Sequence, residues 1–134
     1  MAAGLTMVLL AANGAAAEAA SYEGQVKGDP KSQVDFTTKK QDGKRIITHI
    51  SYLTADNCEN GSSYGGSTFD TKVRIRHGKW DKTYPYAPPN SLRFAGSLVA
   101  GGEKAKGIIN WQAEFEQPTG LCTSGELEWV AHKQ

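Results

Sequence analysis

Apolar and polar residues alternate along most of this chain, and turn residues interrupt the alternation at short intervals. A period of two is typical of β-strands that bury one face and expose the other. We therefore predict strands in the segments that share this alternation: 22–26, 34–38, 46–52, 72–76, 92–98, 109–116 and 126–131. Trp111 and Trp129 occupy the apolar phase of their strands, which predicts that both lie in the core, and Phe115 shares the phase of Trp111.

The segments between these strands complete the fold prediction. Residues 41–43 (QDG) supply a hairpin turn, and residues 55–67 are rich in glycine and serine, which predicts a polar loop. Residues 84–90 (YPYAPPN) carry too much proline for a central strand and predict an ordered loop. Seven or eight short strands at a spacing of about ten residues predict an all-β, mostly antiparallel fold. We expect a jelly-roll-like β-sandwich or a small barrel of about 7–9 strands.

The N-terminus has the pattern of a secretory leader. Residues 5–12 (LTMVLLAA) form an apolar run, and small residues with Ala-x-Ala sites ending at Ala17 and Ala19 follow it. No Lys or Arg precedes the run, and the alternative is a buried helix of the mature domain. We predict a cleaved signal peptide over residues 1–19 and a single β-sandwich domain over residues 20–134. The run is shorter than the roughly 20 apolar residues that cross a bilayer, so we expect no membrane span.

Cys58 and Cys122 are the only cysteines in the sequence. An exported chain enters an oxidising compartment, where two cysteines are most simply one disulfide. The bridge would close a loop of about 65 residues, which corresponds to roughly 4 kcal/mol in the chain-entropy treatment.

Charge is nearly balanced, with 15 Lys and Arg against 14 Asp and Glu. Proteins that bind nucleic acid usually carry a much stronger basic excess, so we expect no nucleic-acid partner. The histidines His49, His77 and His132 and the two cysteines lack the spacing of a zinc site. We therefore expect no metal site and no cofactor.

The segment 56–67 contains two short motifs that do not meet the structural requirements of the sites they usually mark. Residues 61–65 (GSSYG) match G-x-S-x-G, but the chain is too short and too rich in strands for the hydrolase fold that uses this motif. Residues 56–61 (DNCENG) resemble the start of a calcium loop, yet its third position is a cysteine and its twelfth is Ser67. Neither motif identifies a catalytic or metal-binding residue.

Short motifs in the C-terminal part resemble those of a group of secreted proteins. The pattern F-x-G, G-x-hydrophobic, C-x-x-G and W-x-A occurs at Phe94–Gly96, Gly107–Trp111, Cys122–Gly125 and Trp129–Ala131. It resembles small secreted actinobacterial proteins of unknown function, which also carry a mid-chain cysteine. The resemblance implies a secreted β-sandwich with one disulfide, and it implies no catalytic residue.

Glu114 with Glu116, and Glu126 with Glu128, stand two residues apart and would point from the same sheet face. Glycosidases built on β-sandwiches use paired carboxylates, so these residues are the alternative catalytic candidates. Glutamates at alternate strand positions more often mark a solvated face.

Trp80, Tyr84 and Tyr86 fall in a polar, proline-bearing segment, where flat rings could stack on a sugar or a partner. Arg74 and Arg76 form a basic strand face with Lys72 that could attract an acidic envelope polymer. We therefore favour a non-catalytic protein of the extracellular space or cell envelope that binds a partner, small ligand or glycan through these five side chains. The alternatives are a small secreted hydrolase using the Glu pairs, and a secreted inhibitor or effector that presents a loop.

Overall fold

A computed structural model describes residues 19–134 of the chain. The predicted leader over residues 1–19 lies outside this range except for Ala19. Within residues 19–134 no helix is long and apolar enough to cross a membrane.

The described part of the chain is built from antiparallel strands. In order they are β1 (Ala20–Val26), β2 (Gln33–Gln41), β3 (Lys44–Cys58), β4 (Gly61–Ile75), β5 (Lys79–Tyr84), β6 (Ser91–Val99), β7 (Lys104–Glu114), β8 (Leu121–Thr123) and β9 (Leu127–Lys133). A 3-10 turn, η1 (Ala100–Gly102), joins β6 to β7. The predicted all-β antiparallel fold is therefore confirmed.

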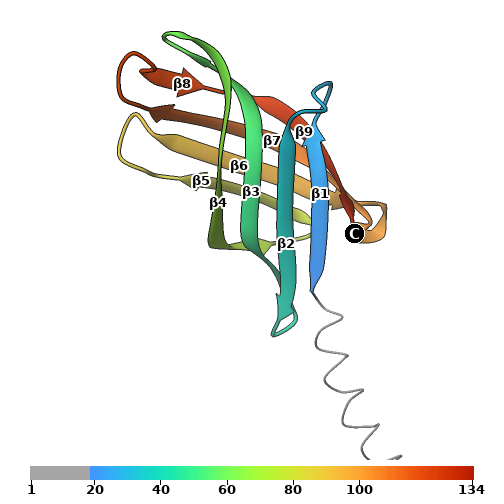
Figure 1. The fold of residues 1–134 in the computed structure, drawn as a ribbon. Coiled ribbons are helices and arrows are strands. Elements are labelled where there is room, and N and C mark those ends of the chain that lie inside the picture. The colour runs from blue at the N-terminus through green and yellow to red at the C-terminus, as the bar shows by residue number, and fades with distance from the viewer. Residues whose placement is uncertain (1–18) are drawn as a thin grey trace, which may run out of the picture.

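The strands form one sheet in the order β4-β3-β2-β1-β9-β7-β6-β5. The short strand β8 pairs with both β3 and β7, so β3, β2, β1, β9, β7 and β8 make a closed ring. This is the barrel form of the prediction, with β4 added beside β3 and β5 and β6 added beyond β7. Figure 1 shows β1–β4 as one layer that crosses the layer of β5, β6, β7 and β9.

Aromatic rings fill the space between the two layers. The Phe36 ring of β2 lies at the centre, with its centroid 4.7 Å from Tyr22, 5.4 Å from Trp80, 5.8 Å from Phe94 and 5.7 Å from Trp129. These five side chains are at most 6% exposed, so the contacts bury large apolar areas from both layers.

The positions of the other aromatic side chains follow from where their strands end. Trp111 and Trp129 are buried, as the alternation predicted. Phe115 shares the phase of Trp111, but it is 50% exposed because β7 ends at Glu114 and the chain turns away from the core.

The glycine- and serine-rich segment 55–67 is not a loop, so that prediction was wrong. It forms the paired ends of β3 and β4, which meet in a two-residue turn with Cys58 opposite Gly61. Bulkier residues would not fit there: a Cβ on Gly66 would lie 1.8 Å from the Tyr52 carbonyl oxygen, and one on Gly65 would lie 2.9 Å from the Trp111 ring. The small residues therefore permit close packing of a strand.

The predicted disulfide between Cys58 and Cys122 is confirmed. It joins the end of β3 to the middle of β8, where the two cysteines are direct cross-strand partners. The bond therefore lies at the contact that closes the ring of strands.

Candidate functional site

A cleft of about 810 Å³ lies over the outer face of β5, β6, β7 and β9. Its floor consists mainly of small residues from β6 and β7, namely Ala95, Gly96, Ser97 and Gly107, together with the larger Ile108. Gly96 must stay small, because an added Cβ would lie 2.7 Å from the Trp80 ring and 2.8 Å from the Trp129 ring. The side of Gly96 that a Cβ would occupy therefore faces the aromatic core.

Charged side chains surround this floor. The cleft is lined by the basic residues Lys27, Arg74, Arg76, Lys79, Arg93 and Lys106 and by the acidic residues Asp81 and Glu128. Six cations against two carboxylates leave an excess of four positive charges. A cleft lined mainly by one sign of charge concentrates the electrostatic potential and attracts ions of the opposite sign.

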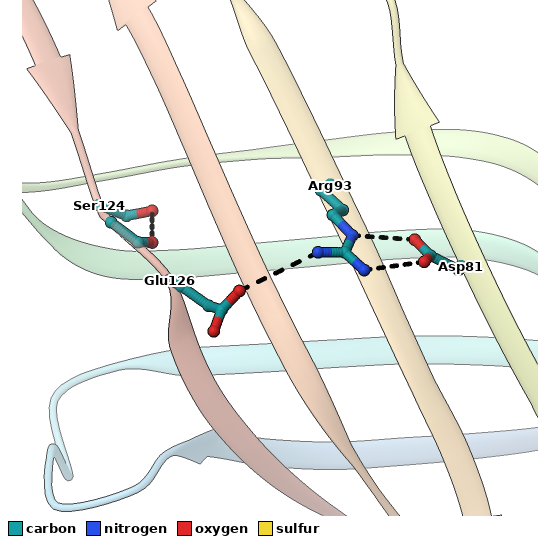
Figure 2. Close-up of polar contacts among 5 residues, drawn as sticks. Asp81, Arg93, Ser124 and Glu126 are labelled. Carbon is teal, nitrogen blue, oxygen red and sulfur yellow. Dashed lines mark hydrogen bonds and ion pairs between the residues drawn. The ribbon is translucent and has the colours of Figure 1, made fainter.

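Arg93 pairs with Asp81 on one side and lies near Glu126 on the other. Its Nε donates to Asp81 Oδ1 at 3.0 Å and its Nη2 donates to Asp81 Oδ2 at 2.8 Å, while Nη1 lies 4.0 Å from Glu126 Oε1. Figure 2 shows the guanidinium between these two carboxylates. The hydrogen bonds from Arg93 hold the pKa of Asp81 below its ordinary value, and Asp81 in turn raises the pKa of Arg93.

The remaining acidic side chain of the cleft is also engaged, since Lys27 Nζ lies 3.9 Å from Glu128 Oε1. Within residues 19–134, the cations Arg74, Arg76, Lys79 and Lys106 make no ion pair. Four positive side chains are therefore available to an external anion.

The strand register places two of these cations on either side of a hydroxyl group. Ser97 of β6 is the direct partner of Lys79 in β5 and of Lys106 in β7. Neighbouring strands are about 4.8 Å apart, so the Cα atoms of the two lysines are separated by about 10 Å. An anionic group above Ser97 can thus be contacted by both ammonium groups and by the hydroxyl.

We expect substitution of Arg93 by glutamine to raise the pKa of Asp81 toward its ordinary value of 3.8, because the charged hydrogen bonds are lost. The Asp81 pKa is lowered in the folded chain, so the Asp81–Arg93 pair stabilises the folded state at pH values above the ordinary pKa of Asp81. That contribution is lost as the pH falls through the lowered value, and it is small because both groups are exposed. NMR titration of the carboxyl carbon measures the effect. Lys79→Ala should leave the Asp81 pKa nearly unchanged, and an unchanged value in Arg93→Gln would contradict the prediction.

The structure separates the five residues predicted to bind a ligand into two groups. Arg74 and Arg76 line the cleft, and so does Trp80. The expectation that Trp80 is an open loop side chain was wrong: it lies in β5 on the inward phase and is 6% exposed, so it presents no free ring face.

Tyr84 and Tyr86 lie elsewhere, where β4 and β5 separate. The Tyr84 ring packs on the edge of Phe69, and its hydroxyl is 2.6 Å from Thr71 Oγ1. Tyr86 stacks on Tyr84 with a centroid distance of 6.1 Å and remains 48% exposed. Tyr84 therefore connects the two edge strands, and neither tyrosine lines the cleft.

The four glutamates of the alternative hydrolase hypothesis are all exposed. Glu114 is the last residue of β7 and pairs with Leu121 of β8, whereas Glu128 pairs with Ile108. Glu126 and Glu128 each lie beside a cation, as described above. The register therefore does not gather the four carboxylates around one point.

Ser63, the central serine of the G-x-S-x-G match, donates its hydroxyl hydrogen to Asp56 Oδ1 at 2.7 Å. Asp56 is buried and lies beside Cys58 and Cys122, with potential ligand atoms of the three within 4.8 Å. Both sulfur atoms are consumed by the disulfide, which leaves one carboxylate and no thiolate ligands for a metal.

Comparison with known proteins adds no relative to this picture. The chain matches no protein-family model, no curated protein and no solved structure.

Proposed function

We propose that this is an exported, non-catalytic binding protein of the extracellular space or cell envelope, and that its basic cleft holds an anionic glycan. The observation that carries the proposal is the row Lys79–Ser97–Lys106, two unpaired ammonium groups flanking a hydroxyl above a floor of small residues. Arg74 and Arg76 add positive charge at the rim.

The cleft suits a hydrated, acidic sugar for two reasons. Ammonium and guanidinium groups attract carboxylate or sulfate, and the serine hydroxyl can exchange hydrogen bonds with sugar hydroxyls. The native carboxylates at the rim do not compete for the free cations, because Arg93 and Lys27 already neutralise them. Binding through exposed charges predicts a strong dependence on ionic strength.

Export is supported by two features. The leader pattern of residues 1–19 is typical of secreted chains. The Cys58–Cys122 disulfide is of the kind that persists in oxidising compartments.

We expect trigalacturonate, a short carboxylated glycan, to bind at low salt, whereas neutral maltotriose should not. The double substitution Lys79→Ala/Lys106→Ala should weaken binding about tenfold, since two exposed ion pairs are lost. Isothermal titration calorimetry measures both affinities.

The charge-matched control is Lys31→Ala/Lys133→Ala, which removes two exposed lysines that do not line the cleft. It should bind like the native protein. If the two double variants lose affinity for trigalacturonate equally, or if the native protein does not bind it, the cleft is not the binding site. Cleavage of the trisaccharide would overturn the non-catalytic role.

A further inference from the structure

A second basic cleft, of about 400 Å³, lies where the β2–β3 hairpin meets the end of β4. Its lining includes the cations Lys40, Lys44, Arg45, Arg74 and Arg76 together with His77, and no carboxylate of residues 19–134 lines it. Within residues 19–134, none of its lysines and arginines makes an ion pair. This cleft is therefore more uniformly positive than the first.

Arg74 and Arg76 line both clefts, so the two clefts meet along β4. Both arginines point outward because the alternating residues Val73 and Ile75 are buried in the core. The chain then turns through His77 and Gly78, and Arg76 pairs directly with Lys79 of β5. Cations thus continue without interruption from one cleft to the other.

We infer that the two clefts form one track for a linear acidic polysaccharide, whose successive anionic groups contact Lys40 and Lys44, then Arg74 and Arg76, then Lys79 and Lys106. The inference rests on the proposed function and extends it from a short anionic sugar to a long one. A chain that occupies both clefts gains affinity because binding in the second becomes intramolecular once the first is filled.

The lining favours a glycan over a single-stranded nucleic acid. Proteins that bind single strands stack the bases on exposed aromatic rings. Trp80 and Trp129 are the aromatic residues that line the first cleft, and they are 6% and 0% exposed. In the described part of the chain, no phenylalanine, tyrosine or tryptophan lines the second cleft. A repeating anion without a base is the ligand that this surface can hold.

A length series of oligogalacturonates tests the track by calorimetry at one low salt concentration. Dodecagalacturonate should bind at least about tenfold more tightly than trigalacturonate. Lys40→Ala/Lys44→Ala should abolish most of this gain, whereas Lys79→Ala/Lys106→Ala should weaken the short and the long probe alike. The control Lys31→Ala/Lys133→Ala should keep the full gain, and equal thermal unfolding midpoints show that the variants fold.

The outcomes separate the two proposals. If the long probe binds no more tightly than the short one, or if Lys40→Ala/Lys44→Ala behaves like the control, the track is overturned and the single-cleft function stands. If neither probe binds, both proposals fall. If a single-stranded DNA dodecamer binds more tightly than dodecagalacturonate at the same salt, the assignment to a glycan is overturned.

Discussion

Removal of the disulfide by the double substitution Cys58→Ala/Cys122→Ala will lower the free energy of unfolding by about 4 kcal/mol. The bond joins residues 64 positions apart, so its loss restores a large amount of conformational freedom to the unfolded chain. Alanine is the appropriate replacement, because Cys122 is 1% exposed and a serine hydroxyl there would need a buried partner.

The fold gives this bond a second effect. β8 has only three residues and pairs with β3 through Asn57–Thr123 and Cys58–Cys122. Two residue pairs are a weak contact on their own, so we expect the ring to open at β3–β8 first when the bond is lost.

Urea denaturation followed by circular dichroism measures the difference in stability. A reducing agent should destabilise the native protein by a similar amount and leave the double alanine variant unaffected. A variant within about 1 kcal/mol of the native protein would contradict the predicted contribution of the bond.

Replacement of Trp129 by alanine will cost about 3–5 kcal/mol of unfolding free energy. The side chain is 0% exposed and its ring lies 5.7 Å from Phe36, 6.0 Å from Trp80 and 5.3 Å from Phe94. Alanine would leave a cavity between the two layers, where packing from both sides limits collapse.

Two further variants make this prediction specific. Trp129→Phe should lose less than half as much unfolding free energy, because an aromatic ring remains and the indole N–H has no hydrogen-bond partner among residues 19–134. Phe115→Ala removes an aromatic ring that is 50% exposed and should cost less than about 1 kcal/mol. Equal losses for Trp129→Ala and Phe115→Ala in urea denaturation would show that Trp129 is not central to the core.

Strands that bury one face could be predicted from the sequence. Buried residues alternate with polar ones in four of these strands, and each strand was found near its predicted position. The buried residues are Val73 and Ile75 in β4, Leu92 and Phe94 in β6, Trp111 in β7 and Trp129 in β9. A period of two is produced by burial itself, so it remains visible without knowledge of the strand partners.

Three features depended on neighbours that the local pattern does not reveal. The segment 55–67 has low strand propensity, yet pairing with β3 and contact with Trp111 determine its structure. Trp80 lies only one residue inside β5, so its direction depends on where that strand starts. Closure of the barrel depends on β8, which is too short to show any periodicity.

The cleft was predicted only in part for the same reason. Arg74 and Arg76 were identified because they alternate with apolar residues on one strand. Lys79 and Lys106 were missed, since only the pairing of both with Ser97 makes them neighbours. The polar phase of β7 was the available signal, but it did not indicate which strand lies alongside.

The place of β1 in the sheet affects the order in which the molecule can assemble. β1 lies between β2 and β9, and its register with β9 joins Val26 to Trp129, roughly a hundred residues later in the chain. During synthesis β1 can form a hairpin with β2 early, but its other edge stays unpaired until residues 127–133 have been made. Contacts of such high sequence separation slow folding, because closing a long loop costs conformational entropy before the contact can form. The ring of strands can therefore close only after β9 has been synthesised.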